Sequence, residues 1–151
     1  MANSRTPAAK DALARLTEEL GSPPFHEFLR PQPVSANPET GMVVVRLPFR
    51  PEFRRAREGV HYHGGVLASL IDLTAHAAVA VHIGRMAPTI DLRIDYLRPA
   101  RGVDLVAVGR VLRSGRSTAQ ADVEVRSEDG CVVAVGRGAF STLAPANADG
   151  Q

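Results

Sequence analysis

The segment HYHGGVLASLID, residues 61–72, combines two histidines, two adjacent glycines and a carboxylate. Ser69, Asp72 and His76 follow one another at i, i+3 and i+7, which places them on one face of a helix. An ionised carboxylate on an otherwise apolar helix is costly unless it is paired or serves a reaction. Asp72 is therefore either part of a reactive site or a structural acid that Ser69 caps or His76 binds.

Gly64 and Gly65 stand where this helix should begin. The first N–H groups of a helix lack intrahelical partners, and the helix dipole is positive at this end. Glycine has no Cβ, so a ligand can approach these donors closely. The arrangement suits a carbonyl oxygen that becomes an oxyanion. A tight turn or close backbone packing would select the same two glycines.

A metal site is a second interpretation, because His61, His63, Asp72, His76 and His82 fall within one region. Their spacing matches no zinc signature. His63 and Asp72 are ~13 Å apart along a helix that rises ~1.5 Å per residue, so they cannot share one ion from one helix. We expect neither a metal nor a cofactor, and we interpret His82 as a favourable charge near the C-terminal end of the helix.

Composition narrows the class of protein. The chain has 151 residues, of which 44% are hydrophobic and 23% charged, which predicts one globular domain. A net charge of +2 and 5% aromatic residues without tryptophan argue against a nucleic-acid partner. Cys131 is alone, so no internal disulfide forms. We find no signal-peptide core and no apolar run near the ~20 residues that span a bilayer, so we expect a cytoplasmic protein without a membrane partner.

Hydrophobic periodicity divides the chain into two N-terminal helices, a strand, a long helix and four further strands. Short turns between consecutive strands predict an antiparallel meander, and one sheet face covered by a helix is α+β. The long helix is apolar in nearly every direction, so we expect a curved sheet, with or without a second subunit, to enclose it. The expected ranges are helices at 8–20, 25–29 and 64–82, a Pro-rich connection at 30–40, a loop at 50–62, and strands at 41–49, 88–97, 103–113, 117–127 and 131–141.

Alternation along two of the strands predicts which side chains face the core. In 117–127, Val123 and Val125 share one face, opposite Asp122, Glu124 and Arg126. In 103–113, we expect the buried set to be Val106, Val108 and either Val111 or Leu112, with a bulge near Gly109.

Four segments together resemble the hotdog-fold acyl-CoA thioesterases of the phenylacetate-degradation type, in the 4-hydroxybenzoyl-CoA thioesterase superfamily. In that family, His-Gly-Gly precedes an apolar helix with an acid nine positions after the histidine, which is Asp72 in this chain. The resemblance covers roughly residues 41–141. Its segments are HGGVLASLID at 63–72, APTIDLRIDYLRPA at 87–100, SGR at 114–116 and DGCVVAVGRGAF at 129–140.

The resemblance implies an antiparallel sheet wrapped around the long helix, with subunits associating through sheet edges into a homodimer or a dimer of dimers. It also implies hydrolysis of an acyl-CoA thioester, without a metal, at sites on the dimer interface. We accordingly expect a helical extension and linker over 1–40, a hotdog thioesterase domain over 41–142 and a flexible tail over 143–151.

Residue by residue, the resemblance makes Asp72 the general base or nucleophile. Gly65, and with it Gly64, would polarise the thioester carbonyl through backbone N–H groups. His63 would hold this loop or lie near the leaving thiolate, and Thr89 would help to position water beside the acid. Along one helix Gly65 and Asp72 are ~10 Å apart, which predicts that each site takes its glycines and its acid from different subunits.

The chain departs from the family at one position. The family often has an asparagine a few residues before the histidine, whereas the segment RRAREGVHYHGG contains none. His61 or Arg57 could replace it as a second carbonyl donor. Arg98 and Arg116 are candidates for binding the CoA phosphates. The missing asparagine motivates an alternative function, a non-catalytic module that binds acyl-CoA or another acyl ligand.

Overall fold

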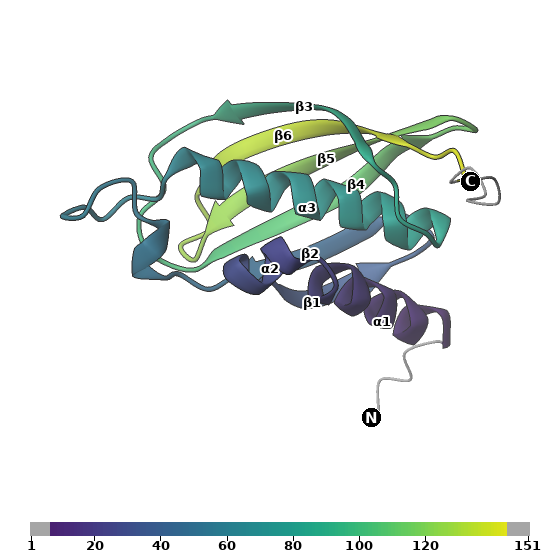
Figure 1. The fold of residues 1–151 in the computed structure, drawn as a ribbon, viewed down its shortest axis with the longest axis horizontal. Coiled ribbons are helices and arrows are strands. Elements are labelled where there is room, and N and C mark those ends of the chain that lie inside the picture. The colour runs from purple at the N-terminus through teal and green to yellow at the C-terminus, as the bar shows by residue number, and fades with distance from the viewer. Residues whose placement is uncertain (1–6, 145–151) are drawn as a thin grey trace, which may run out of the picture.

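A six-stranded antiparallel sheet curves around one long helix in the computed structural model, which describes residues 7–144 (Figure 1). The strand order is β1-β2-β4-β5-β6-β3. The elements are α1 (Pro7–Gly21), α2 (Pro24–Leu29), β1 (Gln32–Asn37), β2 (Met42–Leu47), η1 (Pro51–Phe53), α3 (Gly64–Ile83), β3 (Thr89–Tyr96), β4 (Leu105–Ser114), β5 (Thr118–Ser127) and β6 (Val132–Ser141). This is the predicted α+β hotdog architecture with an added N-terminal helix.

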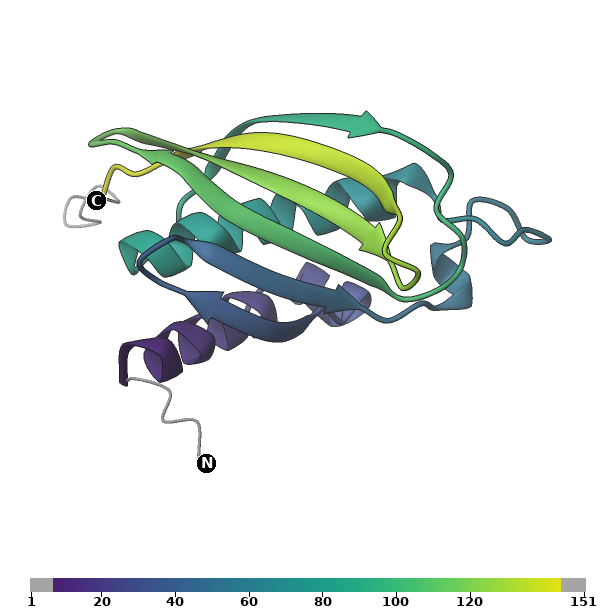
Figure 2. The ribbon, with the colours of Figure 1, turned by 180° about the vertical axis from the view of Figure 1, so that it is seen from behind.

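Helix α3 fills the concave face of the sheet, and Figure 2 shows the opposite, outer face of the strands. It begins after His63 and ends at Gly84, whose φ of 77° is the left-handed conformation that glycine adopts at helix ends. Its 20 residues are long and apolar enough to cross a bilayer, contrary to the sequence analysis. The fold supplies another reason for that composition, because 61% of the helix's most apolar window is buried against the sheet and α1.

The irregular connection expected over 30–40 is wrong, because residues 32–37 form strand β1. This strand pairs antiparallel with β2, from Gln32 opposite Arg46 to Asn37 opposite Met42. The register shifts between Pro33 and Ser35. Proline is tolerated on an edge strand or at a bulge, as Pro33 is here. The prolines of residues 30–40 are also the reason that the sequence predicts a connection instead of a strand. Most of the tail expected over 143–151 lies outside the described residues, from 145 onward.

The expected four-strand meander is wrong in one connection. Strand β3 pairs with β6, and β4 pairs with β2, so the chain crosses the sheet between Tyr96 and Leu105. The antiparallel direction of every pair is confirmed. Turn residues mark where a chain reverses but do not specify which strand becomes the neighbour. As a result β3 lies at the edge of the sheet.

The core face of β4 is the opposite of the one predicted for Val106 and Val108, whereas Val111, one of the two alternatives for the third position, does pack against the core. Leu105 and Ala107 are buried against α3, whereas Val106 and Val108 lie on the other face and are half-buried. A Cβ on Gly109 would lie 3.0 Å from Thr74 of α3, so small residues on this face let the helix approach closely. The bulge occurs between Val111 and Arg113 instead of at Gly109. For β5, burial of Val123 and Val125 is confirmed.

Candidate active site

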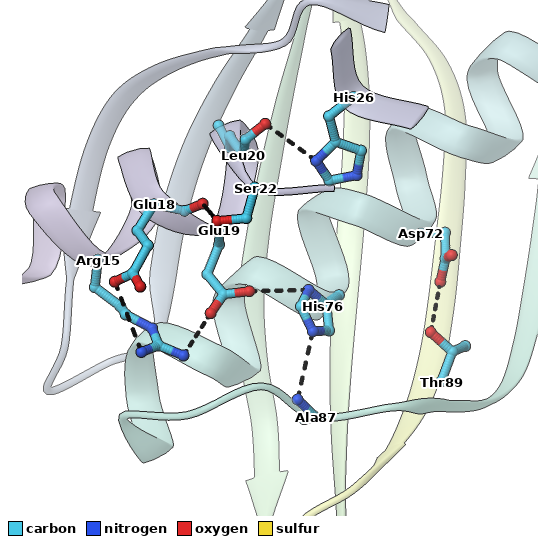
Figure 3. A network of polar contacts seen from close by, with 10 residues as sticks. All are labelled: Arg15, Glu18, Glu19, Leu20, Ser22, His26, Asp72, His76, Ala87 and Thr89. Carbon is cyan, nitrogen blue, oxygen red and sulfur yellow. Dashed lines mark hydrogen bonds and ion pairs between the residues drawn. The ribbon is translucent and has the colours of Figure 1, made fainter. Parts of the chain in front are cut away.

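Asp72 lies in the N-terminal half of α3, and its side chain is half-buried. It faces Thr89, the first residue of β3 (Figure 3). The hydroxyl of Thr89 donates a hydrogen bond to Asp72 Oδ1 over 3.0 Å. Ser69 instead donates to the Gly65 carbonyl over 2.8 Å. His76 contacts Glu19 and Ala87. Asp72 is therefore held neither by Ser69 nor by His76, and the interpretation as a structural acid with those partners is wrong.

His63 caps the start of α3. Its Nδ1 accepts a hydrogen bond from the Gly65 N–H over 2.9 Å, and its carbonyl accepts from the Val66 N–H over 3.0 Å. Its own N–H donates to the Phe53 carbonyl over 2.7 Å. Through these bonds His63 fixes the backbone at the helix start, and its role in a reaction stays a prediction.

The bonding of residues 63–65 leaves one backbone donor without a partner among residues 7–144, the Gly64 N–H. The Gly64 carbonyl accepts from the Tyr96 hydroxyl over 3.0 Å, and the Gly65 carbonyl accepts from Ser69. Buried or half-buried N–H groups normally find a partner, so an open donor at a helix start is a ready site for an acceptor.

Packing and backbone conformation give no reason for a glycine at position 64. The backbone φ is positive at Gly41, Gly84 and Gly130, and at neither glycine of this pair. A Cβ on Gly64 would make ordinary contact with the Tyr96 ring at 3.5 Å. On Gly65 a Cβ would lie 3.0 Å from His63 Nδ1, so Gly65 leaves room for the capping imidazole.

The other predicted binding residues are dispersed. His61 is half-buried and Arg57 exposed in the loop 54–61, which projects from the helix-start end of the molecule (Figure 1). The Arg98 side chain is bound to the end of the β5–β6 turn, where its Nη1 donates to the Val132 carbonyl over 2.8 Å. Arg116 is exposed in the β4–β5 turn. This turn is at the end of the sheet where β3 begins, because Thr118 pairs with Ser141 and Thr89 pairs with Phe140.

Two hollows on the surface contain few of the predicted residues. One of about 540 Å³ lies in the loop 54–61 and includes His61 but not Arg57. The other, of about 550 Å³, lies on the outer face of the sheet among Arg93, Arg110 and Arg137 and contains no predicted site residue. Among residues 7–144, no three histidine, cysteine or carboxylate side chains gather closely enough to hold a metal ion.

The predicted residues therefore form two groups in one chain. Asp72 contacts Thr89, and His63, Gly64 and Gly65 form the helix start with Tyr96. Both groups contact β3, one at its first residue and the other at its last. Gly64 and Asp72 are ~12 Å apart along α3 at ~1.5 Å per residue. The contact of Tyr96 with Gly64 could not be predicted from the sequence, because a pair 32 residues apart leaves no periodic signal.

A further polar network ties α1 to the segment before β3 (Figure 3). Arg15 pairs with Glu19 over 2.5 Å, and Glu19 lies 3.7 Å from His76 Nδ1. His76 Nε2 accepts from the Ala87 N–H over 3.4 Å. Burial lowers the pKa of His76 below its usual 6.5, and His26 and Arg15 lower it further, against opposing effects of Glu19 and Asp72. The imidazole is therefore neutral at neutral pH, as acceptance from Ala87 requires.

This lowered pKa predicts an acid-sensitive fold. Below about pH 6.5 the unfolded chain binds a proton that the folded chain resists, so the free energy of unfolding falls as pH drops toward the lowered pKa. The loss from one such group cannot exceed about 1.4 kcal/mol per pH unit. His76→Gln keeps an acceptor for Ala87 but does not titrate. Denaturant unfolding at pH 7.5 and 5.5 should show a smaller acid-induced loss in this variant; equal losses would exclude His76 as the cause.

Comparisons with known proteins agree with this architecture. The chain is 35% identical over 108 residues to a putative esterase of Saccharolobus solfataricus, covering 71% of this chain and 76% of that protein. It is 40% identical over 88 residues to the medium/long-chain acyl-CoA thioesterase YigI of Salmonella typhimurium, covering 48% of this chain and 56% of the relative. The PaaI protein from the E. coli phenylacetic acid degradation operon superposes with a TM-score of 0.80 at 23% identity, covering 91% and 96% of the two chains, which supports the fold.

Two facts together establish the family, a match to a family model and the coverage of the esterase relative. A sequence model of the thioesterase superfamily matches residues 59–134, which contain the helix start, Asp72, Thr89 and Tyr96. This match spans half of the chain, and the esterase relative is covered over three quarters of its length. The chain belongs to the thioesterase superfamily.

Proposed function

We propose that this protein hydrolyses an acyl-CoA thioester to the free acid and CoA. The observation that carries the proposal is the Gly64 N–H at the start of α3, which no group in the described residues binds, in a family member whose predicted catalytic acid is hydrogen-bonded to Thr89. The N–H would stabilise the negative charge that develops on the thioester oxygen. Asp72 would take a proton from water while the water oxygen attacks the carbonyl carbon, and the CoA thiolate would leave with the free acid formed directly. Alternatively, Asp72 would attack the carbonyl carbon itself, the thiolate would leave, and water would then hydrolyse the acyl-enzyme anhydride to the free acid and Asp72.

The hydrogen bonds favour Gly64 over Gly65 as the main carbonyl donor, which refines the expectation from sequence. The Gly65 N–H already donates to His63 Nδ1, so a carbonyl would have to displace the imidazole to reach it. The Gly64 N–H needs no such displacement. His63 then acts by holding the helix start, and no side-chain contact supports His61 or Arg57 as a replacement for the missing asparagine.

We propose further that two copies associate through β3. Both edges of the sheet are strands with a register shift, but β1 also carries Pro33, a residue that impedes pairing with a further strand. Strand β3 has no proline, and large apolar side chains are exposed along it and beside it. These are Met86, Ile90, Tyr96 and Leu97, each at least 50% exposed. An exposed edge of this kind is a template for another strand.

Antiparallel pairing of two β3 strands would complete the site. A two-fold axis places the first residues of one strand beside the last residues of its partner. Because Thr89 contacts Asp72 and Tyr96 contacts Gly64, each acid would then lie beside the helix start of the other subunit. This arrangement resolves the separation of the two groups along α3. Further association of dimers into a tetramer would use other faces.

The experiment that tests the function is hydrolysis of a panel of short-, medium- and long-chain and aromatic acyl-CoA substrates. Released CoA thiol is detected with a thiol reagent, against matched reactions without protein. We expect turnover of at least one medium- or long-chain substrate, because the relative YigI is named for that class. No thiol release from any substrate, together with calorimetric binding of acyl-CoA, would support the non-catalytic binding module instead, which the missing asparagine motivates.

A further inference from the structure

Tyr96 closes β3 and touches the start of α3 from outside the helix. Its hydroxyl donates to the Gly64 carbonyl over 3.0 Å, and its ring lies where it would contact a Cβ on Gly64. The side chain is 54% exposed, so burial in the core of a single chain does not explain its placement. Its hydrogen bond joins the edge strand to Gly64, the helix residue whose N–H has no partner within the described part of the chain.

The peptide between Gly64 and Gly65 is held from both sides. Tyr96 binds its C=O, and His63 Nδ1 binds its N–H over 2.9 Å. Two glycines in succession would otherwise give this turn more conformational freedom than any other residue pair. Hydrogen bonds on both ends of one amide fix its plane and polarise it. Fixing this plane also limits rotation of Gly64, and with it the direction of the Gly64 N–H.

We infer that Tyr96 is a positioning residue for thioester hydrolysis, holding Gly64 so that its N–H points at the substrate carbonyl. The inference rests on the proposed function. Tyr96 acts through Gly64 and needs no proton transfer of its own. Its position at the end of β3 means that association through this strand would also fix the helix start.

The test compares Tyr96→Phe with Tyr62→Phe, a second tyrosine whose hydroxyl donates to a backbone carbonyl, that of Val103, over 2.9 Å. Loss of the Tyr96 hydroxyl should lower kcat about tenfold and leave KM within about twofold, since the bond orients a group that acts on the transition state. Tyr62 is buried, so Tyr62→Phe should lower the melting temperature but keep kcat within about twofold of wild type.

Amide hydrogen exchange of Gly65 and Val66 by NMR provides a readout that does not depend on activity. Exchange should be faster in Tyr96→Phe than in the wild type and unchanged in Tyr62→Phe. With an active wild type, unchanged kcat or unchanged exchange in Tyr96→Phe would overturn the inference. A wild type inactive on every thioester would instead overturn the proposed function, and the exchange rates would still decide whether Tyr96 holds the helix start.

Discussion

Asp72→Asn should lower kcat by about 10²–10⁴-fold, the usual contribution of a side chain that transfers a proton in the transition state. Asparagine has nearly the same shape and keeps an oxygen that can accept from Thr89, so the contact over 3.0 Å survives. It can neither take a proton from water nor attack a thioester as a carboxylate. The measurement is steady-state release of CoA thiol from the best substrate of the panel.

Stability separates a chemical role of Asp72 from a structural one. A half-buried acid that serves a reaction often destabilises the folded protein. The free energy of unfolding of Asp72→Asn should therefore equal or exceed that of the wild type. Asp11→Asn, which removes an exposed acid of α1, is the matched control and should leave kcat unchanged. If Asp72→Asn hydrolysed as fast as the control, the assigned mechanism would be wrong.

The features that the sequence predicts well are those that depend on residues close together in the chain. The long helix, its start at Gly64 and the burial of Val123 and Val125 follow from local pattern. The family resemblance predicts that Thr89 helps to position water near Asp72, and the structure places the Thr89 hydroxyl 3.0 Å from Asp72 Oδ1. The role of each of these residues in catalysis stays a prediction.

The features that were missed depend on partners distant in the chain. Strand β1 is an edge strand whose Pro33 falls at a register shift, so its local propensity argued against it. Both faces of β4 carry apolar residues, and the closeness of Thr74 to Gly109 decides which face packs on α3. The Gly64 N–H has no partner among residues 7–144, and this depends on how the whole helix start is bonded, including its contacts with Phe53 and Tyr96, which are distant in the chain.

Gly64→Pro is expected to abolish most activity while preserving the fold. Proline removes the Gly64 N–H, which has no partner among residues 7–144, and it breaks no hydrogen bond of the helix start. It is favoured at the first helical position. The preceding residue, His63, has φ −67° and ψ 134°, the extended conformation that proline requires before it. Removal of one oxyanion donor typically lowers kcat by about 10²–10³-fold.

Gly64→Ala is the matched control for this loss. Alanine keeps the N–H, and its Cβ would make ordinary contact with Tyr96 at 3.5 Å. It should fold and retain far more activity than the proline variant. If Gly64→Pro folded with wild-type stability and hydrolysed at the rate of Gly64→Ala, the carbonyl donor would lie elsewhere.

Gly64→Pro, combined with Asp72→Asn, also shows which subunit supplies each half of the site. Asp72→Asn and Gly64→Pro chains with different affinity tags can be co-expressed, and heterodimers recovered through both tags. If the site is shared across β3, one site of each heterodimer combines an intact Gly64 from one chain with an intact Asp72 from the other, while the second site carries both defects. Two-fold symmetry then predicts about half of the wild-type activity per dimer, although each parent variant is nearly inactive. A site contained in one chain would give no recovery, because every chain in the heterodimer carries one defect.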